Sequence, residues 1–192
     1  QLVKDIEIGG RNLITFSLFS SPDIIDSDRS FTGRFWATHI LDNDWVLSFL
    51  KPSTKYTIRY KVKLIEKPDM PNVETWGLGG FILYGGTPAL HLSMLTPEEY
   101  AEMNVGDIIA KEKTFTTPND LTGYRLYCYT ANHSDGTNTE KAKMQFKELK
   151  LEKGNKATDW TPAPEDVEAE INDAKQEALT AAGNAQNTAD SL

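Results

Sequence analysis

The strongest constraint in the sequence is the alternation of apolar and cationic side chains in YTIRYKVKLI, residues 56–65. Successive side chains of a β-strand point to opposite faces, so residues two apart share a face. A strand with one apolar and one cationic face is typical of an antiparallel sheet with one side buried and the other in water. The apolar face would hold Tyr56, Ile58, Tyr60, Val62 and Leu64, and the cationic face Thr57, Arg59, Lys61 and Lys63.

Weaker alternation predicts further strands within residues 30–37, 79–86, 123–130 and 141–152. In the last of these the apolar phase shifts by one residue near Lys147, which predicts a β-bulge. Only residues 96–103 of this region predict a helix, with Thr96 as N-cap, Pro97 at the first position and Glu99 closing a capping box. Many short strands and one small helix favour an all-β fold, a β-sandwich of the jelly-roll, galactose-binding-like type.

The pattern changes after Pro164, where small and apolar residues recur at alternating steps of four and three. Such a heptad seam predicts a helical stalk, a candidate coiled coil, although methyl groups bury little area and Gly183 weakens the helix. The alternative is a disordered tail. The chain then divides into the end of a preceding connector (1–10), a sandwich (11–162) and an alanine-rich stalk or linker (163–192). The seam consists of Val167, Ile171, Ala174, Ala178, Ala181, Ala185, Thr188 and Leu192.

The segment LEKGNKATDWTPAPED, residues 151–166, joins the last predicted strand to this helix. Gly154 allows a turn with positive φ, and Trp160 is expected to fold back and cover an open edge of the core. Pro162 and Pro164 stiffen the exit in an extended form. Asp166 or Thr161 is expected to cap the helix.

Composition excludes several classes of function. The chain has 192 residues, 39% of them hydrophobic, which is enough for one domain with a core and an appendage. A net charge of −8 argues against nucleic-acid binding, and no apolar run reaches the roughly 20 residues of a membrane span. The single Cys128 excludes an internal disulfide; we expect it to be a small buried side chain, the alternative being a nucleophile.

Exposed aromatic rings with polar neighbours are the side chains that bind the flat faces and hydroxyl groups of sugars. Alternation places Trp36 opposite Phe35, and Tyr127 and Tyr129 on one face with Arg125. The alternative for each ring is burial in the core, which we expect for Trp45. The candidate ligand-binding residues are Trp36, Trp76, Tyr84, His91, Arg125, Tyr127 and Tyr129.

No cofactor is expected, and the acidic loops offer only a weak alternative, a structural calcium bound by Asp23, Asp26 and Asp28. Asp42 and Asp44 form a second acidic loop, and neither loop has the spacing of an EF-hand. Scattered histidines and one cysteine argue against zinc. No paired carboxylates, nucleophile elbow or phosphate loop predict catalysis, so we expect a protein that is not an enzyme.

Four segments, GGRNLI (9–14), LKPSTKYTIRYKVK (50–63), FTTPNDLTGYRLYCY (115–129) and LEKGNKATDWTPAPED (151–166), occur in this order. Together they resemble the carbohydrate-binding-module-like domain of tail and baseplate proteins from phages and prophages of Gram-positive bacteria. The resemblance implies a virion protein, made in the host cytoplasm, that binds host cell-wall polysaccharide and other tail or baseplate subunits. The heptad seam adds the expectation of a homo-oligomer in the full-length protein, where neighbouring parts hold the chains together. The alternative is a structural spacer or docking domain without glycan binding, and an enzyme acting on wall sugars ranks below both.

Overall fold

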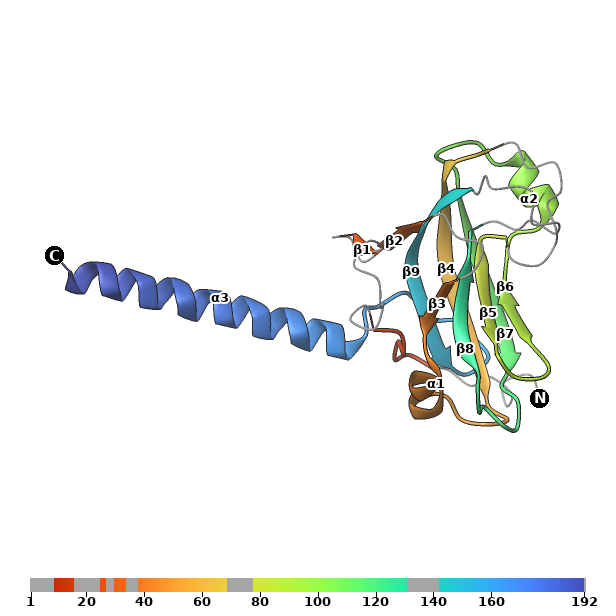
Figure 1. The fold of residues 1–192 in the computed structure, drawn as a ribbon, viewed down its shortest axis with the longest axis horizontal. Coiled ribbons are helices and arrows are strands. Elements are labelled where there is room, and N and C mark those ends of the chain that lie inside the picture. Colours follow the sequence, from red (N-terminus) through yellow and green to blue (C-terminus); the bar gives the residue numbers. More distant parts are fainter. Residues whose placement is uncertain are drawn as a thin grey trace.

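The computed structural model describes residues 9–15, 25–26, 30–33, 38–68, 78–130 and 142–191. These residues form two antiparallel sheets that face each other, with a long helix projecting from one side (Figure 1). The sheets have the strand orders β1-β2-β9-β4-β7 and β3-β8-β5-β6. The first sheet contains β1 (Ile25–Asp26), β2 (Ser30–Gly33), β4 (Lys55–Glu66), β7 (Ile108–Thr116) and β9 (Lys143–Lys153), and the second contains β3 (Thr38–Leu41), β5 (Gly80–Tyr84), β6 (Leu90–Ser93) and β8 (Arg125–Tyr129). The expected all-β domain is confirmed, and the jelly-roll type stays a prediction.

The core lies between the two sheets and is rich in aromatic rings. Phe146 of β9 stacks on Phe31 of β2 with ring centroids 4.9 Å apart, and meets Phe81 of β5 edge-on at 5.4 Å. Tyr60 of β4 meets Phe81 at 4.8 Å, and its hydroxyl donates to the carbonyls of Gly79 and Ser93 across the sandwich. The alternation in β4 is confirmed, since Tyr56, Ile58, Tyr60, Val62 and Leu64 are all buried. Cys128 is also buried in this core, as expected.

Short helices cover the two ends of the sandwich (Figure 1). Helix α2 (Pro97–Glu102) has the predicted capping box: Thr96 Oγ1 accepts from the Glu99 amide, and the Glu99 carboxylate accepts from the Thr96 amide. Helix α1 (Asn43–Phe49) was not predicted and corrects the expectation of one helix in the domain. Asp42 caps α1 by accepting from the Trp45 amide at 2.9 Å, and Trp45 is buried as expected.

The predicted bulge in β9 is confirmed at Glu148. Arg59 pairs with Lys150 and Lys61 pairs with Lys147, so one residue of β4 faces two of β9. Glu148 adopts a φ of 50°, a left-handed conformation that non-glycine residues rarely take. The bulge directs the Glu148 carboxylate toward Lys61, whose Nζ lies 2.5 Å away.

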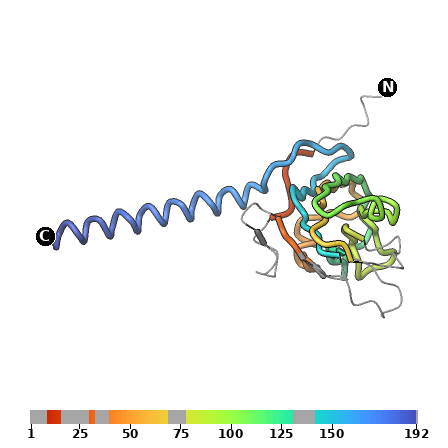
Figure 2. Tube along the Cα trace, turned by 90° about the horizontal axis from the view of Figure 1, so that it is seen from above, coloured from red at the N-terminus to blue at the C-terminus, as the bar shows by residue number. Residues whose placement is uncertain are grey.

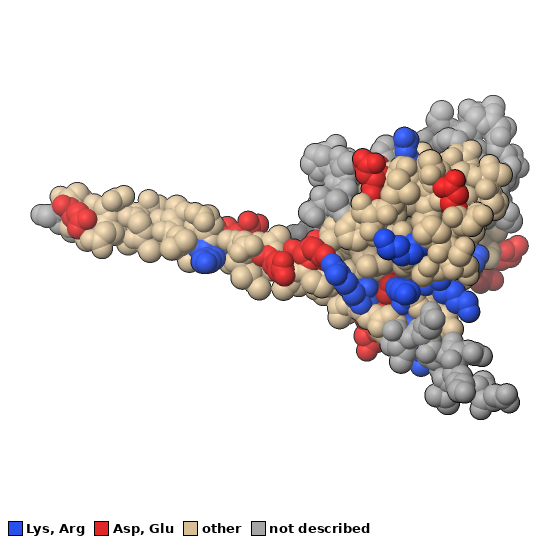
Figure 3. Space-filling model, turned by 90° about the horizontal axis from the view of Figure 1, so that it is seen from below, with Lys and Arg blue, Asp and Glu red and all other residues tan. Residues whose placement is uncertain are grey.

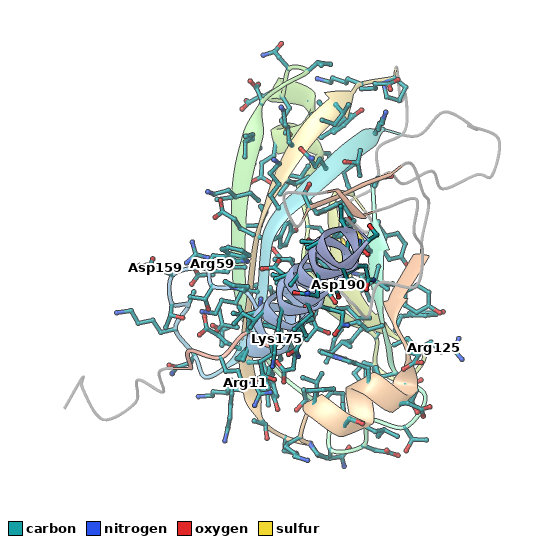
Figure 4. The ribbon with its side chains drawn as sticks, turned by 90° about the vertical axis from the view of Figure 1, so that its left-hand side faces the viewer. Arg11, Arg59, Arg125, Asp159, Lys175 and Asp190 are labelled. Atoms are coloured by element: carbon teal, nitrogen blue, oxygen red, sulfur yellow. The ribbon has the colours of Figure 1, made fainter. Side chains whose placement is uncertain are left out.

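Residues 154–163, which we call the exit segment, lie across the outer face of the five-stranded sheet. Gly154 has the expected positive φ, 118°, and its carbonyl accepts from Thr57 Oγ1 on β4. Arg59 of β4 donates to the Thr158 carbonyl at 2.6 Å. Figure 4 shows Arg59 and Asp159 side by side on this face.

Two charged side chains of β9, Lys150 and Glu152, are buried beneath the exit segment, each with 1% of its side chain exposed. The ammonium and carboxylate groups lie 3.8 Å apart. Lys150 Nζ donates to Thr158 Oγ1 at 2.7 Å and to the Asp159 carbonyl at 2.8 Å. Glu152 accepts from the amide and the hydroxyl of Thr158 at 2.7 and 2.8 Å. Polar contacts to a buried ion pair therefore hold the exit segment on the sheet.

Trp160 lies within the exit segment. Its side chain is half-buried and is not among those packed against the core cluster of the described residues. Its indole Nε1 is buried without a hydrogen-bond partner among those residues. That the indole covers an open edge of the core stays a prediction.

The beginning and the end of the described domain meet at Asn12, which is buried. Its amide Nδ2 donates to the carbonyls of Leu149 and Thr161, and its Oδ1 accepts from the amides of Ile14 and Leu151. Arg11 also forms an ion pair with Glu165 in the first turn of the projecting helix. The segments GGRNLI and LEKGNKATDWTPAPED, distant in sequence, thus form one junction.

Helix α3 (Pro164–Asp190) leaves this junction and runs straight away from the sandwich (Figure 2). Its N-cap is Ala163 and no side chain caps it, so the cap expected from Thr161 or Asp166 is wrong. The seam is exposed: Val167 and Ile171 have 37% and 61% of their surface accessible. Leu192 lies outside the described residues. Among the described residues, no helix combines the length and the apolar character needed to cross a membrane.

Candidate functional site

The outer face of the four-stranded sheet brings together five of the seven predicted ligand-binding residues. Tyr84 of β5 pairs with Arg125 of β8, and the next outward pair along the same strands is Ile82 with Tyr127. Directly paired residues of antiparallel strands have their side chains on the same face. His91 of β6 pairs with Ile82 from the other side. We call Tyr84, Tyr127, Tyr129, Arg125 and His91 the tyrosine face.

The three tyrosines of the tyrosine face differ in how much of their surface is exposed. Tyr84 is 53% exposed, Tyr127 is half-buried and Tyr129 is 4% exposed. The rings of Tyr84 and Tyr127 meet edge-on, with centroids 5.9 Å apart and planes 89° to each other. Ile82, also on this side of β5, is buried and does not belong to the core between the sheets. The face therefore presents one open ring, Tyr84, braced by a second ring beside an apolar floor.

Burial raises the pKa of the Tyr129 phenol, and the nearby phenols of Tyr127 and Tyr84 add to the effect. The Tyr129 phenol therefore stays protonated at neutral pH. A protonated phenol both donates and accepts a hydrogen bond, as sugar hydroxyl groups do.

Arg125 and His91 supply polar groups at the edge of the face, and both are exposed. Figure 4 shows Arg125 pointing away from the sandwich on the side opposite Arg59 and Asp159. A guanidinium has five N–H donors in a planar fork and can hold two neighbouring oxygens at once. An open ring with a bidentate donor beside it has the chemistry to bind a polyhydroxylated ligand.

The glycines around β5 serve the packing of the protein instead of giving a ligand access to the backbone. A Cβ at Gly80 would lie 2.0 Å from the Ser93 carbonyl oxygen, and one at Gly86 would lie 2.0 Å from the Tyr124 ring. Neighbouring strands and rings fill this space. Within β5, Tyr84 is the exposed residue.

Most of the remaining predicted site residues lie outside the described part of the chain. Trp36, Trp76, Asp23 and Asp28 lie outside the described residues, and Asp26 is described only as a backbone member of β1. Asp42 caps α1, and Asp44 lies in its first turn. Within the described part of the chain, no group of three His, Cys, Asp or Glu side chains could hold a metal ion.

Burial raises the pKa of the Cys128 thiol well above its ordinary value. A thiol buried in apolar surroundings stays protonated and unreactive, because the thiolate is the nucleophile. The expectation that Cys128 is a packing residue is therefore preferred over the nucleophile.

Charged side chains of the two signs are mixed where α3 leaves the sandwich. Figure 3 shows Lys and Arg gathered on the sandwich at this place, beside acidic side chains in the first turns of α3. The pair Arg11–Glu165 joins the two parts.

The sequence matches no protein-family model and no curated protein. Among solved structures, the fold is similar to a chain in the structure of the tripod (BppUct-A-L) from the baseplate of bacteriophage Tuc2009. The TM-score is 0.55 and the identity 16%, and the match covers 84% of this chain and 61% of the other. The chain thus spans less than two thirds of the protein it matches, and the likeness is one of fold.

Proposed function

We propose that the chain is a non-catalytic module of a phage tail or baseplate protein that binds saccharide on the host cell surface through the tyrosine face. The similarity of the fold to a chain of a phage baseplate tripod supports the location in a virion. The sequence resemblance to carbohydrate-binding-module-like tail domains supports the ligand class. The single observation that carries the binding proposal is the open ring of Tyr84, braced by Tyr127 and paired with Arg125.

The mechanism follows from these groups. The Tyr84 ring offers an apolar surface to the C–H face of a sugar, and Tyr127 holds that ring edge-on. Arg125 donates to neighbouring hydroxyl groups, and His91 lies across the sheet. The junction at Asn12 and the buried pair Lys150–Glu152 fix the domain at the base of α3, so the face is presented at a set angle from the stalk.

A second candidate function is a spacer or docking domain that contacts other tail or baseplate subunits. The burial of Tyr129 and Ile82 on the outer side of the four-stranded sheet favours it, because a fully open lectin site would leave both accessible. The two functions differ in what the face binds: a glycan in the first case and a protein in the second.

Tyr84→Ala tests the saccharide site. We expect affinity for cell-wall polysaccharide purified from Gram-positive bacteria to fall at least tenfold, about 1.4 kcal/mol, because the stacking surface is lost. Unfolding free energy should change by about 1 kcal/mol or less, since the ring is exposed. The measurement is isothermal titration calorimetry beside thermal denaturation.

Leu47→Ala is the matched control, because Leu47 is 48% exposed on α1 and does not belong to the tyrosine face. Equal affinity of the wild type and Tyr84→Ala would exclude the tyrosine face as the site. Binding of a purified tail or baseplate subunit in place of any polysaccharide would favour the docking function.

The exposed seam of α3 supports the further proposal that copies of the chain join through this helix. We expect sedimentation equilibrium at high protein concentration to give a mass above the 21.5 kDa of one chain. Ile171→Asn, on the seam, should return it to one chain, while Leu179→Asn, also exposed but off the seam, should not. A mass of one chain at every concentration would contradict self-association.

A further inference from the structure

The outer face of the five-stranded sheet contains a hollow of about 230 Å³ between β4, β7 and β9, which we call the β4–β7 pocket. It lies on the opposite side of the sandwich from the tyrosine face, as the positions of Arg59 and Arg125 in Figure 4 show. The side chains that give it its character are those of Arg59, Lys61, Ala110, Glu112 and Glu148.

Two local features create the hollow. Ala110 of β7 pairs with Lys61 of β4, and its methyl group leaves the floor low between longer neighbours. The bulge in β9 places Glu148 at the far wall, with the left-handed φ of 50°. Residues in such conformations, and bulges that re-aim a side chain, are concentrated at functional sites.

The walls of the pocket carry charges of both signs. Lys61 Nζ lies 2.5 Å from the Glu148 carboxylate, and Arg59 donates to the Thr158 carbonyl in the exit segment. Glu112 of β7 lies directly opposite Arg59 of β4 in the strand register, so the two side chains share this face. Lys111 pairs with the core residue Tyr60, and its ammonium binds both oxygens of Glu99 at 2.8 and 2.9 Å, so its charge does not enter the pocket.

This balance of charges selects the class of ligand. An anion would meet the carboxylates of Glu112 and Glu148, and a cation would meet Arg59 and Lys61. A neutral polyol satisfies both signs, because each hydroxyl group donates to a carboxylate and accepts from a guanidinium or ammonium group. The volume is below the roughly 300–1,000 Å³ of sites for drug-sized ligands, which fits one sugar ring.

We propose that the β4–β7 pocket is a saccharide site that binds a single neutral sugar unit by polar contacts, without a stacking ring. This proposal goes beyond the proposed function, because the β4–β7 pocket lies on the other sheet and contains none of the residues of the tyrosine face. The module then has one site on each outer face, the first built on an aromatic ring and the second on charged side chains.

The test is a titration of the ¹⁵N-labelled chain with the methyl glycosides of glucose, galactose, rhamnose and N-acetylglucosamine, followed by amide chemical shifts. At least one glycoside should give saturable shifts at residues 59–61, 110–112 and 148. Ala110→Phe should weaken that binding at least tenfold, because the ring fills the hollow from an exposed position. Glu112→Gln should weaken it about fivefold, since an amide accepts fewer hydrogen bonds than a carboxylate.

Val105→Phe is the control, since Val105 is exposed in the turn before β7 and does not line the pocket. Tyr84→Ala should leave these shifts unchanged, which separates this proposal from the tyrosine face. The proposal is overturned if no glycoside shifts these amides, if Ala110→Phe leaves the shifts intact, or if glycerol phosphate binds the pocket more tightly than every glycoside.

Discussion

Lys150→Met should destabilise the domain by roughly 3–5 kcal/mol, because it leaves the Glu152 carboxylate buried without its counter-charge. Both side chains are 1% exposed, so water does not replace the lost ammonium group. The exit segment also loses the Lys150 donor to Thr158 and Asp159. Chemical denaturation followed by far-ultraviolet circular dichroism measures the change.

Two further variants test whether the unpaired Glu152 carboxylate causes this loss of stability. Lys153→Met removes an exposed lysine from the same strand and should change the unfolding free energy by about 0.5 kcal/mol or less. Lys150→Met combined with Glu152→Leu should recover part of the loss, since no unpaired carboxylate remains, although the Thr158 amide loses its acceptor. A Lys150→Met protein as stable as the wild type would show that the ion pair does not hold the exit segment.

Phe146→Ala should cost about 3–5 kcal/mol, the range for truncating a fully buried aromatic ring. Phe146 is 0% exposed and contacts rings from both sheets, Phe31 beside it and Phe81 across the core. Its removal leaves a cavity between rigid β-strands, which close poorly over the space. Thermal and chemical denaturation should both show the loss.

Phe146→Leu is the matched comparison, since it keeps most of the apolar volume and should cost clearly less than the alanine variant. The difference between Phe146→Leu and the wild type reports the ring contacts, and the difference between the two variants reports the apolar burial. Equal stabilities of Phe146→Ala and the wild type would mean that the sheets do not pack through this cluster.

Local patterns in the sequence predicted the elements whose structure depends on near neighbours. The alternation in residues 56–65 identified the central strand β4, and the phase shift near Lys147 identified the bulge at Glu148. The capping box from Thr96 to Glu99 identified α2. Each of these signals arises from contacts within a few residues or from the two faces of one strand.

Elements with weak patterns were missed. Helix α1 has only seven residues, and its run of Trp45, Val46 and Leu47 has the apolar density of a buried strand. Asp42, three residues before the Trp45 amide that it caps, was the available signal. Strand β7 lies at the edge of its sheet and is largely exposed, so it lacks an apolar alternation.

The candidate site was predictable only within one strand. Alternation placed Arg125, Tyr127 and Tyr129 together, but the approach of Tyr84 and His91 depends on pairing between β5, β6 and β8. Alternation along the strand also predicts that Lys150 and Glu152 lie on the solvent-exposed face of the sheet. They are buried because the exit segment folds back over that face, a contact that no single-strand pattern encodes.

The most direct test of the account is a map of where cell-wall polysaccharide contacts the ¹⁵N-labelled wild-type chain. We expect saturable amide shifts on the outer side of β5 and β8, strongest at Tyr84, Arg125 and Tyr127, with α3 unaffected. Binding at the tyrosine face is contradicted if the polysaccharide leaves the chemical shifts of all these amides unchanged, whether it binds elsewhere or not at all.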